Sequence, residues 1–275
     1  MTRLIAVLFL LLAAPAAAQP KAPAVPARAA ILVEFDTGAV LFARNADAGR
    51  PPASLTKLMT LEVVFHEMAQ GRLRPDTTFT VSERAVRRGR PTPRASTMFL
   101  EAGMKVSVAD LIAGLVVASG NDAALVIAEG VAGSEAAFVR RMNERAKAIG
   151  LTRSRFTNPH GFDSPEQRAS MRDMARLAAH LVRAYPDRYP VFARRSFTFA
   201  GVTQHNRNPV LGMPGVDGLK TGQTQGAGFA LVASARRDGR RLILALGGAG
   251  SEADREEAAR ALLDWGFSRP AAASR

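Results

Sequence analysis

A serine and a lysine stand three residues apart near the start of an apolar segment, in the stretch Pro52–Met59. On a helix, positions i and i+3 share a face, with Cβ atoms about 5–6 Å apart, so the amine of Lys57 can reach the hydroxyl of Ser54. A hydroxyl with a base within hydrogen-bond reach is the arrangement of an activated nucleophile. A serine at a helix start is also typical of an N-cap, so this pair alone leaves both interpretations open.

The segment that follows Ser54 is apolar on nearly all sides, which predicts a buried helix rather than a half-exposed one. Its apolar residues are Leu55, Leu58, Met59, Leu61, Val63, Val64, Phe65 and Met68. Burial disfavours the charged form of an amine and lowers its pKa. Lys57 is therefore a candidate base at neutral pH.

Two further short motifs carry polar side chains that could act on a substrate. Ser119-Gly120-Asn121 separates apolar helical segments at 108–117 and 123–132, so we expect a loop that is held rigidly from both sides. Lys220-Thr221-Gly222 lies at the end of a predicted strand in the C-terminal part of the chain. The three motifs together place three hydroxyls (Ser54, Ser119 and Thr221), one amide and two amines at candidate site positions.

The elements that must position these motifs predict an α/β protein of the α+β type. A hairpin of strands at 29–35 and 40–42 comes first, helices fill the middle, and strands at 229–235 and 242–246 follow. The patterns Ser170-x-x-Asp173 and Ser251-x-x-Asp254 predict the starts of two further helices. This order favours an antiparallel sheet of N- and C-terminal strands, flanked by helices, with an inserted helical subdomain. Ser54 would lie at the seam between the two parts.

The two ends of the 275-residue chain are expected to lie outside the folded domain. A basic start, an apolar run and Ala16-Ala17-Ala18 predict a cleaved signal peptide over residues 1–18. Residues 19–28 are rich in Pro and Ala and predict a disordered lead-in, and residues 268–275 predict a frayed tail. We therefore expect a single folded domain over 29–267 in a soluble, exported protein of the periplasm or cell wall.

Composition excludes several classes of function. The chain has no cysteine, so disulfides and thiol catalysis are excluded, and a net charge of +13 favours polyanionic surroundings such as a cell wall. The arginines between 84 and 94 lack interleaved aromatic residues and are predicted to be a solvated loop surface, with no nucleic-acid partner. The scattered His66, His160, His180 and His205 lack metal-ligand spacing, and no glycine-rich phosphate loop is present, so the sequence predicts neither a metal nor another cofactor.

The three motifs stand in the order that is typical of penicillin-binding proteins and class A β-lactamases. The longer stretches 52–60, 119–124 and 216–222, with Ala227-Gly228-Phe229, resemble the low-molecular-weight D-alanyl-D-alanine carboxypeptidases. The resemblance covers about residues 29–267 and implies a β-lactamase/transpeptidase-like fold. It also implies peptidoglycan stem peptides as substrates and β-lactam antibiotics as covalent inhibitors.

The resemblance implies that Ser54 attacks the carbonyl between the last two D-alanines of a stem pentapeptide and forms an acyl-enzyme, which water then hydrolyses. Lys57 would accept the Ser54 proton, and Ser119 would pass a proton to the leaving amine. Asn121 would hold a substrate carbonyl and the Lys57 amine.

On the substrate side, the resemblance implies that Lys220 and Thr221 bind the terminal carboxylate. Gly222 would let the peptide backbone approach the strand edge as an extra strand. The oxyanion hole would consist of the backbone N–H groups of Ser54 and Gln223.

Several positions match the family more loosely. Arg255 would help to bind the carboxylate and Arg207 would support Lys220, although each is equally consistent with a surface arginine or a structural ion pair. Gln223 stands where relatives often have His. The expected donor is the backbone N–H, so this difference of side chain does not remove it. Met171 replaces a Thr that is common just before the predicted helix with Asp173, which leaves the hydrogen bonding of that segment open.

Many relatives continue into a β-rich domain and an amphipathic anchoring helix, whereas this sequence ends shortly after Trp265-Gly266-Phe267. We therefore expect no such domain and no stable membrane anchor of that kind.

Three other functions stay open beside the carboxypeptidase. A D,D-endopeptidase that cuts peptidoglycan cross-links would use the same residues on a longer substrate. A β-lactamase is disfavoured because Glu166 is followed four residues later by Ser170, so the Glu-x-x-x-Asn signature for deacylation is absent. An inert cell-wall-binding protein is disfavoured because all the polar motif side chains are present.

Overall fold

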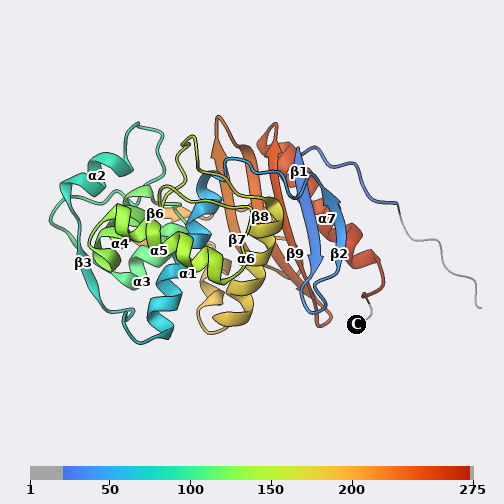
Figure 1. The fold of residues 1–275 in the computed structure, drawn as a ribbon, viewed down its shortest axis with the longest axis horizontal. Helices are drawn as coiled ribbons and strands as arrows, with labels where there is room; N and C mark the ends of the chain where they lie inside the picture. Colours follow the sequence, from blue (N-terminus) through green and yellow to red (C-terminus); the bar gives the residue numbers. More distant parts are fainter. Residues whose placement is uncertain (1–20, 273–275) are drawn as a thin grey trace, which may run out of the picture.

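The computed structural model describes residues 21–272 (Figure 1). The predicted signal peptide lies outside the described residues, as do residues 273–275. In the part of the chain that is described, no helix combines the length and the apolar content needed to cross a membrane.

One sheet joins the N-terminal and C-terminal parts of the chain. Its five strands are antiparallel and follow the order β2-β1-β9-β8-β7. They are β1 (Ala29–Glu34), β2 (Val40–Arg44), β7 (Val216–Thr224), β8 (Gly228–Arg237) and β9 (Arg240–Ala249). The N-terminal strand β1 pairs with the last strand β9, as the sequence predicted. The sheet is therefore built from the two ends of the domain, and most of the helices lie between them in the sequence.

Helices cover both faces of this sheet (Figure 1). α7 packs on β8 and β9, whereas α6 packs on β1 and β9 from the other side. The helices are η1 (Ala53–Leu55), α1 (Thr56–Ala69), α2 (Glu83–Gly89), α3 (Val108–Val116), α4 (Asn121–Ala132), α5 (Glu135–Ala148), α6 (Met171–Ala184), η2 (Tyr189–Ala193) and α7 (Glu252–Ser268). Two small hairpins complete the fold: β3 (Thr78–Thr80) with β4 (Lys105–Ser107), and β5 (Ser196–Phe199) with β6 (Val202–His205).

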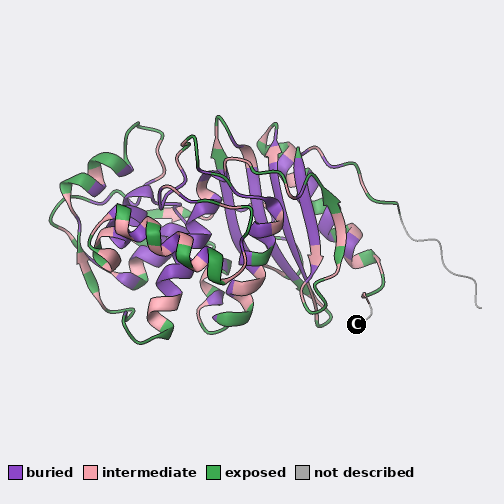
Figure 2. Cartoon of the chain, viewed as in Figure 1, coloured by how far each residue is buried: buried purple, intermediate pink, exposed green. Residues whose placement is uncertain are grey.

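The sheet separates two apolar cores. Successive side chains of a strand point to opposite faces, so Leu244 and Leu246 of β9 pack under α7, while Ile243 and Ala245 face the larger core of α1 and its neighbours. Figure 2 shows the central strands and the inner helices as buried over most of their length. The helix α1 is buried through most of its length, as its apolar sequence predicted.

Serine side chains begin most of the longer helices. Each accepts a hydrogen bond from the backbone N–H three residues later, which satisfies a donor that has no partner inside the helix. The capping residues are Ser82, Ser107, Ser134, Ser170 and Ser251. The predicted starts at Ser170 and Ser251 are therefore confirmed.

The region between α1 and α3 differs from the prediction. The arginines at 84, 87 and 88 lie on the helix α2, not in a loop, because Ser82 caps the segment and Glu83 stands in its first turn. Residues 97–100 have a β-like sequence but form neither a strand nor a helix. The backbone N–H groups of Met98 and Leu100 are instead bonded to the carboxylate of Asp122.

The terminal predictions are wrong for the residues nearest the domain. Val25 and Ala27 are buried, and the Arg28 N–H donates to Gly248 O, so the segment before β1 is packed rather than disordered. At the other end α7 continues to Ser268, and the Ala272 N–H donates to the Glu34 carboxylate. Apolar side chains and a buried acceptor hold both segments against the sheet.

A buried carboxylate ties α1 to the helices around it. Glu62 has no exposed surface, and its Oε1 accepts hydrogen bonds from Arg145 at 2.7 Å and from the Tyr185 hydroxyl at 3.2 Å. Arg145 lies on α5 and Tyr185 follows α6. A single side chain of α1 thus fixes the helix that carries Lys57 against two others.

We expect Glu62→Gln to lower the free energy of unfolding by about 3 kcal/mol, because it removes one partner of a buried ion pair whose arginine is only partly exposed. Urea unfolding followed by circular dichroism measures the change. The control is Glu67→Gln on the same helix, whose partner Arg72 is half exposed, with an expected loss of at most about 1 kcal/mol. Equal losses in the two variants would contradict this role of Glu62.

Candidate active site

Ser54 lies in the 3-10 turn that leads into α1, where the helix meets β7. The N-cap position of α1 is Leu55, and no side chain caps the first turn. The hydroxyl of Ser54 is therefore not used as a cap, and its Oγ lies 3.1 Å from Lys57 Nζ. This geometry decides between the two interpretations that the sequence left open for the serine.

The Lys57 amine is surrounded by oxygen atoms. Besides Ser54 Oγ, it contacts Asn121 Oδ1 at 2.8 Å and the backbone oxygen of His160 at 2.5 Å. An amide oxygen and a carbonyl can only accept, so a neutral amine must direct both N–H bonds toward them. Its lone pair then faces Ser54, which can donate its proton to it. This arrangement orients a base toward a nucleophile.

The pKa of Lys57 lies well below the normal value of 10.5. Burial is the main cause, since the side chain has no exposed surface, and repulsion from Lys220 and Arg207 adds to it. Asp122 acts in the opposite direction but more weakly than burial and Lys220. Both larger effects favour the neutral amine that a proton acceptor requires.

The second lysine lies on the other side of Ser119. Lys220 Nζ contacts Ser119 Oγ at 3.0 Å and the backbone oxygen of Thr221 at 3.0 Å. Burial, followed by repulsion from Arg207 and Arg255, lowers the pKa of Lys220 to about 7. The hydroxyl of Ser119, at a φ of 57°, accepts from this amine and can donate its own proton into the cleft.

Two glycines allow the backbone to approach Ser54 closely. A Cβ at Gly222 of β7 would lie 3.2 Å from the Ser54 nitrogen, and a Cβ at Gly161 would overlap the Ala53 carbonyl. Gly161 also has a φ of +98°, which side chains rarely adopt. Both positions therefore need glycine for the strand edge and the 158–161 loop to lie against the nucleophile.

A small polar cleft of about 160 Å³ opens beside Ser54. It is lined by Ser54, Arg94, Ser96, Ser119, Arg207, Thr221, Gly222, Gln223, Glu252 and Arg255. Arg255 is 5% exposed, its Nε has no hydrogen-bond partner among the described residues, and its guanidinium lies over the ring of Phe229. Arg207 donates to Ser96 Oγ at 2.7 Å.

The structure brings together every site residue that the sequence nominated. Seven of them line the cleft, and Lys57, Asn121 and Lys220 contact it from behind through the hydrogen bonds above. The pairing of Arg207 differs from the expectation, because its hydrogen bond goes to Ser96 rather than toward Lys220. Its effect on Lys220 is electrostatic.

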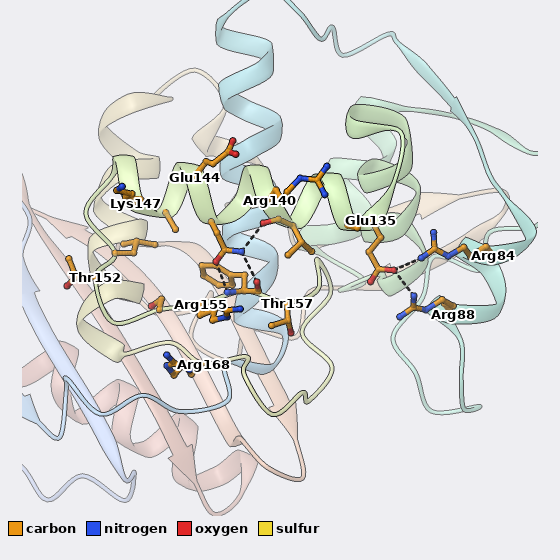
Figure 3. A pocket seen from close by; sticks show the side chains of 17 residues that line it. Arg84, Arg88, Glu135, Arg140, Glu144, Lys147, Thr152, Arg155, Thr157 and Arg168 are labelled. Atoms are coloured by element: carbon orange, nitrogen blue, oxygen red, sulfur yellow. Dashed lines mark hydrogen bonds and ion pairs between the residues drawn. The ribbon is translucent and has the colours of Figure 1, made fainter.

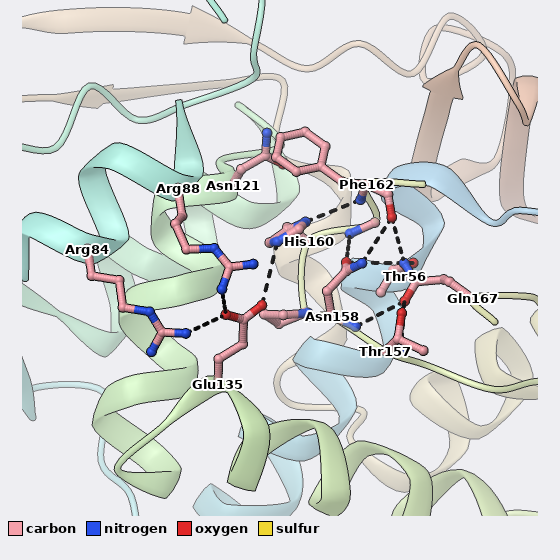
Figure 4. Close-up of polar contacts among 12 residues, drawn as sticks. Thr56, Arg84, Arg88, Asn121, Glu135, Thr157, Asn158, His160, Phe162 and Gln167 are labelled. Atoms are coloured by element: carbon pink, nitrogen blue, oxygen red, sulfur yellow. Dashed lines mark hydrogen bonds and ion pairs between the residues drawn. The ribbon is translucent and has the colours of Figure 1, made fainter. Parts of the chain in front are cut away.

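The sequence did not reveal that residues 158–161, held by Gln167, pack against α1 (Figure 4). Thr60 Oγ1 donates to Pro159 O at 2.6 Å, next to the His160 carbonyl that accepts from Lys57. Asn158 Oδ1 accepts from Gly161 N, and Gln167 Oε1 accepts from Asn158 N. The only sequence signal was the turn-forming pattern Asn158-Pro159-His160-Gly161, which says nothing about the helix it supports.

The imidazole of His160 is part of the same loop and is 3% exposed. Burial, with repulsion from Lys57 and Arg88, lowers its pKa to about 3, so the ring is neutral at physiological pH. Its Nδ1 accepts from the Phe162 N–H, which places the proton on Nε2, 3.8 Å from the Glu135 carboxylate (Figure 4). The ring packs the loop, while its backbone oxygen contacts the base.

A larger hollow lies elsewhere, between α2, α5 and the segment 151–157 (Figure 3). This groove of about 1130 Å³ contains arginines and two glutamates, and Arg84 and Arg88 are bonded to Glu135. None of the motif residues lines it. The small cleft beside Ser54, not the large groove, is therefore the candidate active site.

The fold places the chain in the class of penicillin-binding proteins. It is similar to the crystal structure of penicillin binding protein 5 from Haemophilus influenzae, with a TM-score of 0.87 and 41% identity over 90% of this chain and 73% of that one. It is also similar to penicillin-binding protein D2 from Listeria monocytogenes in its cefotaxime-bound form, with a TM-score of 0.81 and 28% identity over 90% of this chain and 100% of that one.

The chain belongs to the D-alanyl-D-alanine carboxypeptidase family, whose model matches residues 16–250. It is 44% identical over 250 residues to the D-alanyl-D-alanine carboxypeptidase DacD of Salmonella typhimurium, covering 90% of this chain. It is 42% identical over 248 residues to DacA of Haemophilus influenzae, covering 89% of this chain. The chain spans 64% and 63% of the length of these two relatives. The resemblance seen in the motifs is confirmed.

We expect Gly161→Ala to slow the labelling of the protein by a fluorescent penicillin by about 10²-fold, because the new Cβ displaces the turn that carries Ser54. The control is Gly71→Ala, which has a similar positive φ of +69° but no atom within 4 Å of the new Cβ. Both variants carry backbone strain, so equal labelling rates would show that the 158–161 loop does not position the nucleophile.

Proposed function

We propose that this protein is a serine D,D-carboxypeptidase that removes the terminal D-alanine from peptidoglycan stem pentapeptides. The observation that carries the proposal is the 3.1 Å contact of Ser54 Oγ with a buried lysine whose other partners are acceptors. Membership of the D-alanyl-D-alanine carboxypeptidase family supports it. The predicted signal peptide supports a reaction outside the cytoplasm, where peptidoglycan lies.

In the first half of the proposed reaction, the Ser54 proton passes to the neutral amine of Lys57 while Oγ forms a bond to the carbonyl carbon between the two D-alanines. The negative charge that develops on the carbonyl oxygen is stabilised by the backbone N–H groups of Ser54 and Gln223. Asn121 keeps the amine in place at 2.8 Å.

In the second half, the bond to the leaving D-alanine breaks, and its nitrogen takes the proton of the Ser119 hydroxyl, which Lys220 replaces with one of its own. Water then attacks the acyl-enzyme, its proton passes through Ser119 back to Lys220, and Ser54 regains its proton from Lys57. Lys220, Thr221 and Arg255 hold the terminal carboxylate, because their charges and hydroxyl converge on the cleft beside Ser54.

β-Lactams are proposed as covalent inhibitors that acylate Ser54 and leave slowly. Structures of the Listeria relative with cefotaxime and with ampicillin support this. Glu166, the acid compared above with the Glu-x-x-x-Asn signature of deacylation, forms an ion pair with Arg155, and its side chain is 63% exposed. It therefore offers no buried base to activate water against the acyl-enzyme.

We expect mass spectrometry of the intact protein after incubation with benzylpenicillin to show a single covalent adduct, and we expect Ser54→Ala to show none. The same variant should lose D-alanine release from a monomeric pentapeptide. A cross-linked peptide dimer in a parallel reaction separates the exopeptidase from a D,D-endopeptidase. Undiminished peptide hydrolysis by Ser54→Ala would reject the proposed nucleophile.

We expect the rate of acylation by benzylpenicillin to rise with pH through the depressed pKa of Lys57 and to fall below it, since the ammonium form donates to Ser54 and cannot accept its proton. Lys57→Ala should lower the rate by about 10²–10⁴-fold and remove this acidic limb. The exposed Lys105 provides the control, and Lys105→Ala should leave rate and profile unchanged. An acidic limb that persists in Lys57→Ala would assign the titration to another group.

A further inference from the structure

The cationic side chains at the cleft beside Ser54 outnumber those required to bind one carboxylate. Arg94, Arg207 and Arg255 line it, and the amine of Lys220 lies behind it. Among the described residues that line the cleft, Glu252 is the only acid, and its side chain is 72% exposed. One terminal carboxylate can be held by Lys220 and Arg255, so two arginines remain for another anion.

These two arginines are linked through one short segment. Arg207 Nη1 donates to Ser96 Oγ at 2.7 Å, and Arg94 lies two residues before Ser96 on the same wall of the cleft. Lys220 and Arg255 come from different elements, β7 and α7. The positive charge is therefore divided between two sets of residues that belong to different parts of the fold.

The segment that carries Arg94 is anchored next to the catalytic motif. Ser96 O accepts from the Asn121 N–H at 2.8 Å, and the Asp122 carboxylate accepts from the Met98 N–H at 3.0 Å. The exposed side chain of Arg94 makes no hydrogen bond or ion pair to any other described residue. Its backbone is thus held at the cleft while its guanidinium is available to a ligand.

We propose that Arg94, Ser96 and Arg207 form a second anion subsite, which binds a side-chain carboxylate on the residue that precedes the two D-alanines of the substrate. This rests on the proposed carboxypeptidase function. Consecutive residues of an extended peptide are about 3.5 Å apart, so a carboxylate on a long side chain of that residue remains near a cleft that contains Ser54. The planar guanidinium groups match the two oxygens of a carboxylate, and the Ser96 hydroxyl keeps Arg207 oriented.

The experiment uses two peptides that end in D-Ala-D-Ala and differ only at the preceding side chain, which ends in a carboxylate in one and in its carboxamide in the other. D-Alanine release gives kcat/KM for each. We expect the wild type to prefer the carboxylate by about fivefold, the effect of a partly exposed ion pair, and Arg94→Gln to bring the ratio to about one. High salt should reduce the wild-type ratio in the same direction.

Arg90 supplies the matched control, since it lies on the same segment but its guanidinium is over the Phe99 ring and it does not line the cleft. Arg90→Gln should keep the wild-type ratio. Equal kcat/KM values for the two peptides in the wild type, or the same ratio in wild type and Arg94→Gln, would reject the subsite while leaving the carboxypeptidase intact. Release of D-alanine from neither peptide would reject both proposals.

A pair of penicillins gives a second readout that needs no peptidase turnover. Benzylpenicillin is compared with a penicillin that carries an additional carboxylate on the same side chain, and the acylation rates are measured by mass spectrometry. For each protein we take the acylation rate by the penicillin with the additional carboxylate, divided by the rate by benzylpenicillin. This quotient should be about fivefold higher for the wild type than for Arg94→Gln. An identical ratio of rates in the two proteins would contradict the proposal.

Discussion

The structure depends on keeping one lysine uncharged inside the protein. Lys57 has no exposed surface, and an ammonium there would need its full desolvation cost to be offset by its partners. Among the described residues, two acceptors besides Ser54 contact the amine, the Asn121 amide and the His160 carbonyl, and neither carries a negative charge. The environment therefore favours the neutral form, which is the form that can take a proton from a hydroxyl.

The positive charges around the cleft have two effects at once. Lys220 and Arg207 repel a proton on Lys57, and they also lie beside the cleft in which the carboxylates of a peptide would bind. A bound carboxylate would partly cancel this repulsion, so substrate binding and the basicity of Lys57 are electrostatically linked. Several cations and only one acid line this cleft of about 160 Å³, so its charge is complementary to an anionic ligand such as the one proposed above.

The fold achieves this geometry with segments that are distant in sequence. Residue 54 begins α1, residue 121 begins α4, residue 160 belongs to a loop before α6, and residue 220 lies on β7. The sheet order makes this possible, because β9 pairs with β1 and with β8, and β8 in turn holds β7 against η1. Glu62 adds a fixed point, since it bonds α1 to Arg145 and Tyr185 on other parts of the chain.

The sequence by itself determined the three motifs, the buried helix, the caps Ser170 and Ser251 and a sheet of N- and C-terminal strands, because these follow from local spacing, apolar periodicity and residue types that act within one turn. It did not determine α2, the packing of residues 25–28, or the support of α1 by Asn158 and Gln167, because a short helix and a polar loop are stabilised by contacts that the local pattern does not contain. Only the tertiary structure decided that Ser54 is not a cap, that Arg207 bonds Ser96, and that a backbone carbonyl at residue 160 contacts the base. A carbonyl is present at every residue, so its role comes from where folding places it and not from the side chain that the sequence records.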